Sequence, residues 1–174
     1  MPKNALPKPL ILKAAPVAES LYARVKTQAQ TFQKLHKRPA TLATILVGED
    51  SASQIYVRKK GEMCTALGLG HKDFKLASTT STKELLKLIA SLNTDNSIDG
   101  ILVQKPLPNA IDTTAVMHSI DPKKDVDCFS PHNVGLLAQG LATLLPCTPA
   151  GIFEILKHYK IEVSGRNILV IGRS

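Results

Sequence analysis

Tyr56 and Lys60 could together bind and act on a flat, polarised small molecule. They lie four positions apart in the segment Ser51–Lys60, which follows an apolar run at 42–47 and the turn Gly48–Asp50. Residues four apart share one face of a helix. An aromatic ring can support a flat ligand, and an amine partly removed from water can carry protons. The alternatives are a surface lysine and a core aromatic whose hydroxyl reaches the rim.

Two further polar residues follow apolar segments. Gln104 ends the run 98–103, where a neutral amide can hold a lysine amine without fixing its charge state as a carboxylate would. The alternative for Gln104 is a loop-capping hydrogen bond. Asp127 could accept paired hydrogen bonds from an N–H-rich heterocycle, or it could pair with Lys123 or Lys124. These alternatives stay open at the level of the sequence.

The remaining polar candidates give weaker signals. For Asp125 a salt bridge or a loop cap is the better interpretation. Gly172, Arg173 and Ser174 follow an apolar run and resemble half of a phosphate-binding turn, in which an arginine suits a phosphate group. The five histidines show no metal-ligand spacing, so no metal site is expected.

The elements that must position these residues alternate between strands and helices. Such alternation predicts a parallel sheet covered by helices on both faces, with ligands at the carboxyl ends of the strands. The predicted strands cover 41–47, 73–76, 98–103 and 167–171. The predicted helices cover 17–26, 51–67, 82–92 and 112–120. Gly68 is expected to end the second of them, and residues 80–84 offer a cap for the third. A further helix is expected to begin at Thr148, with Ile152, Ile155 and Leu156 on its apolar face. Residues 133–145 predict an irregular crossing or a short helix.

Composition limits the classes of partner. The 174 residues carry a net charge of +8 but only 4% aromatics, and the basic residues are scattered, which disfavours nucleic acid. No apolar run approaches the roughly 20 residues of a membrane span, so no membrane partner is expected. The three cysteines are widely spaced, which favours reduced thiols in the cytoplasm, and a mitochondrial location stays open.

Taken together, the motifs resemble the bifunctional methylenetetrahydrofolate dehydrogenase/cyclohydrolase family from about Leu10 to the last residue. Seven segments in the family's order and spacing make this a specific signal. They are 45–48, 51–60, 99–108, 121–127, 133–135, 146–151 and 170–174.

The resemblance implies an enzyme of one-carbon metabolism and purine biosynthesis. In such enzymes 5,10-methylenetetrahydrofolate is oxidised with NADP, and water then opens the methenyl cation to 10-formyltetrahydrofolate. By resemblance, Lys60 is the general acid/base, Gln104 positions it, and Tyr56 stacks on the folate. Asp127 bonds the pterin and Ser53 lies against the folate.

The resemblance also assigns further binding residues and a domain division. Val103 and Pro106 match substrate-binding positions; Thr148, Gly172, Arg173 and Ser174 match positions on the NADP side. The expected division is a folate-binding catalytic domain at 1–149 and, at 150–174, a linker helix with the first strand of a truncated NADP-binding, Rossmann-type domain. A homodimer is expected, or a second chain that supplies the missing NADP domain.

The chain departs from the family pattern at several positions. The family usually has leucine at Lys105 and glycine at Cys128; if Cys128 needs a positive φ, its side chain costs on the order of 1 kcal/mol. Family members also continue for roughly a hundred residues, so the apolar run 168–171 is expected to be an exposed edge.

Because of the length difference, three functions stay open for the chain. It could be the amino-terminal half of the bifunctional enzyme, a folate-binding or regulatory module without catalysis, or a cyclohydrolase-only fragment. An unrelated nucleic-acid-binding protein is a distant fourth.

Overall fold

Strand β1 (Thr41–Val47) lies at the centre of a three-stranded parallel sheet. In the computed structural model, which describes residues 9–172, the strand order is β2-β1-β3, with β2 spanning Gly70–Leu76 and β3 spanning Gly100–Val103. Both neighbours run parallel to β1, so all three strands end at the same edge of the sheet. This edge is where the sequence predicts a ligand site.

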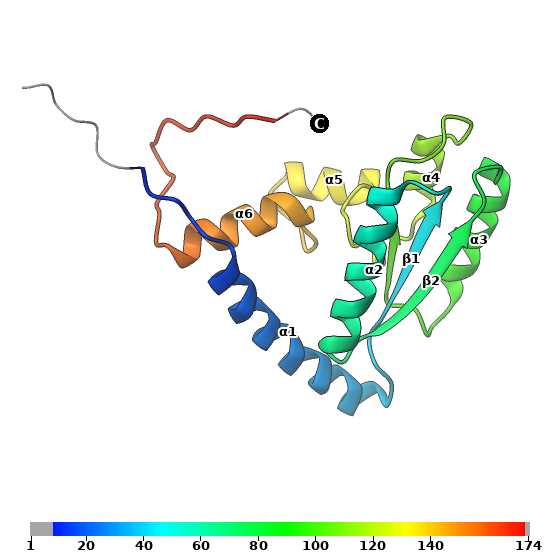
Figure 1. Cartoon of the computed structure of the whole chain (residues 1–174), viewed down its shortest axis with the longest axis horizontal. Coiled ribbons are helices and arrows are strands. Elements are labelled where there is room, and N and C mark those ends of the chain that lie inside the picture. Colours follow the sequence, from blue (N-terminus) through cyan, green and yellow to red (C-terminus); the bar gives the residue numbers. More distant parts are fainter. Residues whose placement is uncertain (1–8, 173–174) are drawn as a thin grey trace, which may run out of the picture.

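Helices cover both faces of the sheet (Figure 1). One face is covered by α2 and the other by α3 and α4, which confirms the predicted three-layer α/β fold. In chain order the helices are α1 (Ala15–His36), α2 (Ser51–Ala66), α3 (Thr82–Thr94), α4 (Thr113–Ser119), α5 (Pro131–Ala138) and α6 (Cys147–His158). The short helix predicted within 133–145 is α5, which begins slightly earlier, at Pro131. The chain beyond α5 is irregular as far as α6.

The main hydrophobic core lies between the sheet and the layer formed by α3 and α4. Ile45 and Ile101 from the sheet pack there with Leu85, Ile89 and Val116, all of them essentially inaccessible to solvent. Truncating such a side chain to alanine typically costs about 2–5 kcal/mol. This packing makes the sheet a rigid support for groups at its edge.

Local signals explain where the elements begin and end. The cap predicted at 80–84 is a capping box formed by Ser81 and Glu84 at the start of α3, and Asp112 caps α4 by accepting from the amide of Ala115 at 2.9 Å. Gly68, at φ 76°, follows the end of α2, as predicted. Strand β2 begins at Gly70, three residues before its predicted start, and pairs with β1 in regular register from there. The sequence did not indicate this earlier start because the residues after Gly70 are polar, which is unusual for a strand.

Helices α1 and α6 pack against each other (Figure 1). The Tyr159 hydroxyl, just after α6, exchanges two hydrogen bonds of 3.1 Å with the backbone of Lys13, and Arg24 pairs with Glu154 at 3.5 Å. The predicted α6 is present, but none of its residues is fully buried and Ile152 is 53% exposed.

Residues 167–171 form no strand, although the sequence predicts one. A strand needs a neighbour for its hydrogen bonds, and the described part of the chain offers none there. Ile168 to Ile171 are extended and exposed, as expected for an apolar edge. Arg173 and Ser174, two of the predicted cofactor residues, lie outside the described residues. Within 9–172, no helix is long and apolar enough to cross a membrane.

Candidate active site

The turn between β1 and α2 sets the position of the site. Gly48 adopts φ 85°, which favours glycine, and its amide donates to the Leu76 carbonyl at 2.9 Å. Asp50 then caps α2 by accepting from the amide of Ser53 at 2.7 Å. Hydrogen bonds from Ser53 hold the pKa of the Asp50 carboxyl below its usual value. Helix α2 therefore starts at the carboxyl edge of the sheet, with Ser53 buried in its first turn.

Lys60 and Gln104, predicted to act together, are in direct contact. The Lys60 ammonium donates to Oε1 of Gln104 at 3.1 Å. Gln104 is fixed at both ends, because its backbone amide donates to the Ile45 carbonyl and its Nε2 donates to the Lys105 carbonyl, each at 2.8 Å. Only Oε1 can accept, so this network orients the amide toward the lysine. The lysine thus meets a neutral partner: Lys60 is half-buried, and Gln104 bonds both its own loop and the lysine.

Tyr56 is accessible to a ligand. Its side chain is 62% exposed, so it is not a core aromatic. It lines a groove of about 490 Å³ together with Tyr22 from α1 and with Lys59, Lys60 and Met63 from its own helix. A flat molecule can lie against such a ring while reaching the Lys60 amine.

A second groove meets the first at Lys60. It has a volume of about 430 Å³ and is mainly apolar, with walls from Leu42, Leu102, Val126 and Cys147. Lys60 therefore lies where an exposed aromatic groove and an apolar trough along the sheet come together.

Asp127 lies on the same side of the molecule as Lys60. Both residues lie close enough to the thiol of Cys147 to change its pKa. Burial raises the pKa of this thiol, the negative Asp127 raises it further, and the positive Lys60 lowers it. Lys124 is engaged elsewhere, because its ammonium donates to the carbonyls of Leu92 and Asp95 at 2.9 Å. Within the described range, the ion pairs closer than 4.0 Å do not include Asp127. Within these residues its carboxylate therefore has the neutral Cys147 thiol, and no cation, as a hydrogen-bonding neighbour.

Asp125 has a structural role, as its sequence context predicts. It is 1% exposed and accepts hydrogen bonds from the amides of Ser130 and Phe129 and from the side chain of Asn133, at 2.7, 3.2 and 3.0 Å. Burial alone would raise its pKa, but these hydrogen bonds outweigh burial and lower it. They hold the loop in which Cys128 has φ 59°, the strained backbone considered for this position.

The other predicted site residues are spread over different surroundings. Val103 is buried at the end of β3, and Pro106 is exposed in the loop that follows. Thr148 is exposed in the first turn of α6, and Gly172 lies in the extended end of the described chain. The rest of the predicted phosphate turn lies outside the described residues, and Thr148 and Gly172 by themselves do not make a complete nicotinamide cofactor site.

Two residues that line the site were missed by sequence reasoning. Tyr22 enters the exposed groove from a helix distant in sequence, and no local pattern signals it. Cys147 faces the Lys60 side of the sheet, and its only signal is its place in the motif 146–151.

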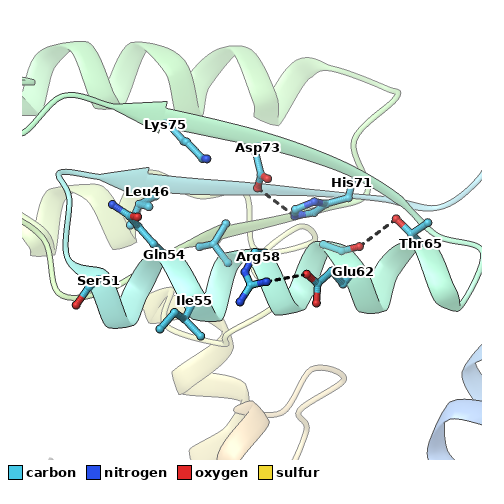
Figure 2. A pocket seen from close by; sticks show the side chains of 12 residues that line it. Leu46, Ser51, Gln54, Ile55, Arg58, Glu62, Thr65, His71, Asp73 and Lys75 are labelled. Atoms are coloured by element: carbon cyan, nitrogen blue, oxygen red, sulfur yellow. Dashed lines mark hydrogen bonds and ion pairs between the residues drawn. The ribbon is translucent and has the colours of Figure 1, made fainter.

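A larger groove lies on the opposite flank of α2, between that helix and β2 (Figure 2). It measures about 600 Å³, and both of its carboxylates are paired: Glu62 with Arg58 and Asp73 with His71, each at 3.3 Å. His71 also contacts the hydroxyl of Thr44. None of the residues predicted to do chemistry lines this groove.

Comparison with known proteins agrees with this geometry. Residues 12–127 match the model of the tetrahydrofolate dehydrogenase/cyclohydrolase catalytic domain, and residues 146–174 match that of the family's NAD(P)-binding domain. The bifunctional protein FolD of Campylobacter concisus is 51% identical over 164 residues, 94% of this chain and 58% of the relative. That of Zymomonas mobilis is 46% identical, over 95% of this chain and 56% of the relative.

Solved structures show the same likeness. The FolD methylenetetrahydrofolate dehydrogenase/cyclohydrolase of Campylobacter jejuni superposes with a TM-score of 0.89 at 40% identity, covering 95% of this chain and 58% of that one. The Trypanosoma brucei enzyme, solved with NADP cofactor and inhibitor, gives 0.85 at 29% identity, over 92% and 55% of the two chains. The chain thus spans somewhat more than half the length of the relatives it matches. With the catalytic-domain model matched over most of its length, it belongs to the tetrahydrofolate dehydrogenase/cyclohydrolase family.

Proposed function

We propose that the cleft around Lys60 binds a tetrahydrofolate derivative and that the chain hydrolyses 5,10-methenyltetrahydrofolate to 10-formyltetrahydrofolate. The observation that carries this proposal is the 3.1 Å hydrogen bond from Lys60 to Gln104 at the carboxyl edge of the sheet. Tyr56 would stack on the folate, and Asp127 would accept hydrogen bonds from the N–H groups of the pterin. Ser53 and Val103 would shape the floor of the site, and Pro106 its rim.

The chemistry requires one group that both takes and gives a proton. Water adds to the bridging carbon of the methenyl cation, and the Lys60 amine accepts the proton that this water loses. The added hydroxyl then becomes the formyl carbonyl and releases its remaining proton to solvent, while the bond from that carbon to N5 of the folate breaks and N5 receives a proton from the Lys60 ammonium. Gln104 suits this cycle because its amide oxygen can hold the lysine in either charge state.

Oxidation of 5,10-methylenetetrahydrofolate with NADP is proposed for the full-length protein. When bound, NADP would accept the hydride from the bridging carbon. Thr148, Gly172, Arg173 and Ser174 are the residues that we assign to its side of the site. Because Thr148 and Gly172 by themselves make no complete cofactor site, whereas every residue proposed for hydrolysis is described, we assign the hydrolytic step to the 174-residue chain.

We also propose the division into a catalytic unit at 1–149 and an NADP-side segment at 150–174, in a cytoplasmic protein. A homodimer, or a chain that supplies the cofactor domain, is the proposed partner. Support comes from the exposed apolar side chains near the carboxyl end of the chain. They are Leu137, Leu141, Leu145, Ile152, Phe153 and the run 168–171. Light scattering of the purified chain would show whether it associates.

The hydrolytic proposal is tested with purified protein and methenyltetrahydrofolate, whose absorbance decays on hydrolysis. We expect Lys60→Met to lower the rate by about 100-fold or more, the usual contribution of a general acid/base. Arg58→Met is the matched control, because it removes a cation from the other flank of the same helix, and it should leave the rate unchanged. Hydrolysis that survives in Lys60→Met, or a wild-type rate no faster than that in buffer, would overturn the proposal.

A further inference from the structure

Lys105 and Phe129 form a contact between the two loops that carry the site. The Lys105 ammonium lies 3.7 Å from the centre of the Phe129 ring, within the range in which a cation is attracted to an aromatic face. Lys105 follows Gln104 after β3, and Phe129 lies two residues beyond Asp127. The contact therefore joins the loop that holds Gln104 to the loop that holds Asp127.

The two ends of this contact differ in how firmly they are held. The backbone of Phe129 is anchored, because its amide donates to the buried carboxylate of Asp125 at 3.2 Å. Lys105 is exposed, and the cation–π contact is the interaction that the structure gives its side chain within the described residues. The anchored residue is thus Phe129, and the contact of the Lys105 ammonium with its ring holds the Lys105 backbone in place.

The Lys105 backbone in turn orients the glutamine. The Lys105 carbonyl accepts from Nε2 of Gln104 at 2.8 Å, and this bond leaves Oε1 facing the Lys60 ammonium at 3.1 Å. If this carbonyl moved, the amide could rotate and turn its NH₂ group toward the ammonium, which cannot accept a hydrogen bond. The orientation of Gln104 thus depends on where residue 105 is held.

We propose that Lys105 is a positioning residue: its cation–π contact with Phe129 fixes the carbonyl that orients Gln104 toward Lys60. The effect on catalysis rests on the proposed hydrolysis, whereas the effect on the Gln104 amide does not. The opposing possibility is that Lys105 is a solvated lysine on the rim of the site that influences nothing beyond its own side chain.

The test uses the full 174-residue chain with the variants Lys105→Leu, Lys105→Arg and Phe129→Leu. Lys87→Leu, on the exposed side of α3, is the control for replacing a lysine by leucine. The first readout is hydrogen exchange at the Gln104 side-chain amide, followed by NMR. The second is the kcat for methenyltetrahydrofolate hydrolysis. Thermal unfolding midpoints confirm that each variant is folded.

We expect exchange at Gln104 to become about two- to fivefold faster in Lys105→Leu and in Phe129→Leu, the factor that corresponds to a cation–π contact at an exposed site. The kcat should fall by a similar factor, with KM nearly unchanged. Lys105→Arg should restore both values, because a guanidinium also lies over an aromatic face. Combining Lys105→Leu with Phe129→Leu should add little to either variant alone.

Unchanged Gln104 exchange in Lys105→Leu would overturn the proposal, as would a Lys105→Arg variant that behaves like Lys105→Leu. If the wild-type chain hydrolyses nothing, the proposed function fails, but the exchange measurement still decides the role of Lys105.

Discussion

The two flanks of helix α2 differ in how their charges are satisfied. On the flank that faces β2, both carboxylates have partners: Glu62 pairs with Arg58 and Asp73 with His71 (Figure 2). On the other flank, Lys60 meets only the neutral amide of Gln104, and Asp127 has no ion pair within the described residues.

This difference indicates which groove is built for a ligand. A carboxylate that is already paired with a cation attracts an incoming ligand only weakly. Groups without charged partners, such as the lysine, the carboxylate and the exposed ring near Gln104, can still bind one. The groove beside β2 is the larger, at about 600 Å³, yet both of its carboxylates already have a partner. Volume alone would have selected the wrong flank.

The two flanks can be separated first by removing one carboxylate from each. Asp127→Ala should weaken tetrahydrofolate binding by about 10- to 100-fold, the value of a hydrogen bond to a charged group. Asp73→Ala, in the groove beside β2, should leave the affinity unchanged. Isothermal titration calorimetry measures both, and equal losses in the two variants would refute the distinction.

On the flank facing β2, helix α2 packs closely against the sheet at Gly61. A Cβ on Gly61 would lie 2.6 Å from Nδ1 of His71, so Gly61→Ala must displace the His71 ring or the helix. We expect a loss of about 1–3 kcal/mol in the free energy of unfolding, measured in urea. Gly151→Ala is the control, since a Cβ in that helix meets nothing within 4 Å. Adding His71→Ala should recover part of the loss; no recovery would contradict the packing explanation.

Asp125 is a carboxylate whose hydrogen bonds are made within the protein, in contrast to Asp127 in the same loop. Hydrogen bonds lower the pKa of Asp125 in the folded state, so it stabilises the fold above its unfolded pKa of about 3.9. This contribution is lost as the pH falls from that value through the lower folded pKa. Asp125→Asn should cost about 1–3 kcal/mol at neutral pH. It should also show a weaker loss of stability in acid than the wild type; equal acid slopes in urea titrations would contradict this.

The smallest expected effect concerns the aromatic ring of Tyr56. Tyr56→Leu should weaken tetrahydrofolate binding by about two- to tenfold, because stacking contributes roughly 0.5–1.5 kcal/mol beyond area burial. Tyr56→Phe keeps the ring and should bind nearly as well as the wild type. An equal loss in both variants would show that the hydroxyl, not the ring, is used.

Much of this arrangement could be predicted from the sequence because local and periodic signals set it. The apolar runs of β1 and β3, the capping residues Ser81 and Asp112, and the four-residue spacing of Tyr56 and Lys60 are all visible in the chain. The meeting of Lys60 and Gln104 follows from the parallel-sheet rule, which brings strand ends to one edge.

Features that depend on distant contacts could not be predicted. The early start of β2 depends on pairing with Thr41, and the ring of Phe129 reaches Lys105 only through the tertiary fold. The predicted strand at 167–171 failed for the same reason, because an apolar sequence cannot form a strand without a neighbour. Likewise, the spacing that marks α6 as amphipathic does not show what covers its apolar side chains.

The most direct test of the central claim is a titration of the isotope-labelled chain with tetrahydrofolate, followed by NMR. We expect the resonances of Tyr56, Lys60, Gln104 and Asp127 to shift together and saturably, while those of Arg58, His71, Asp73 and Lys75 stay in place. Shifts confined to the groove between α2 and β2, or no saturable shift around Lys60, would contradict the assignment of the ligand site to the Lys60 flank.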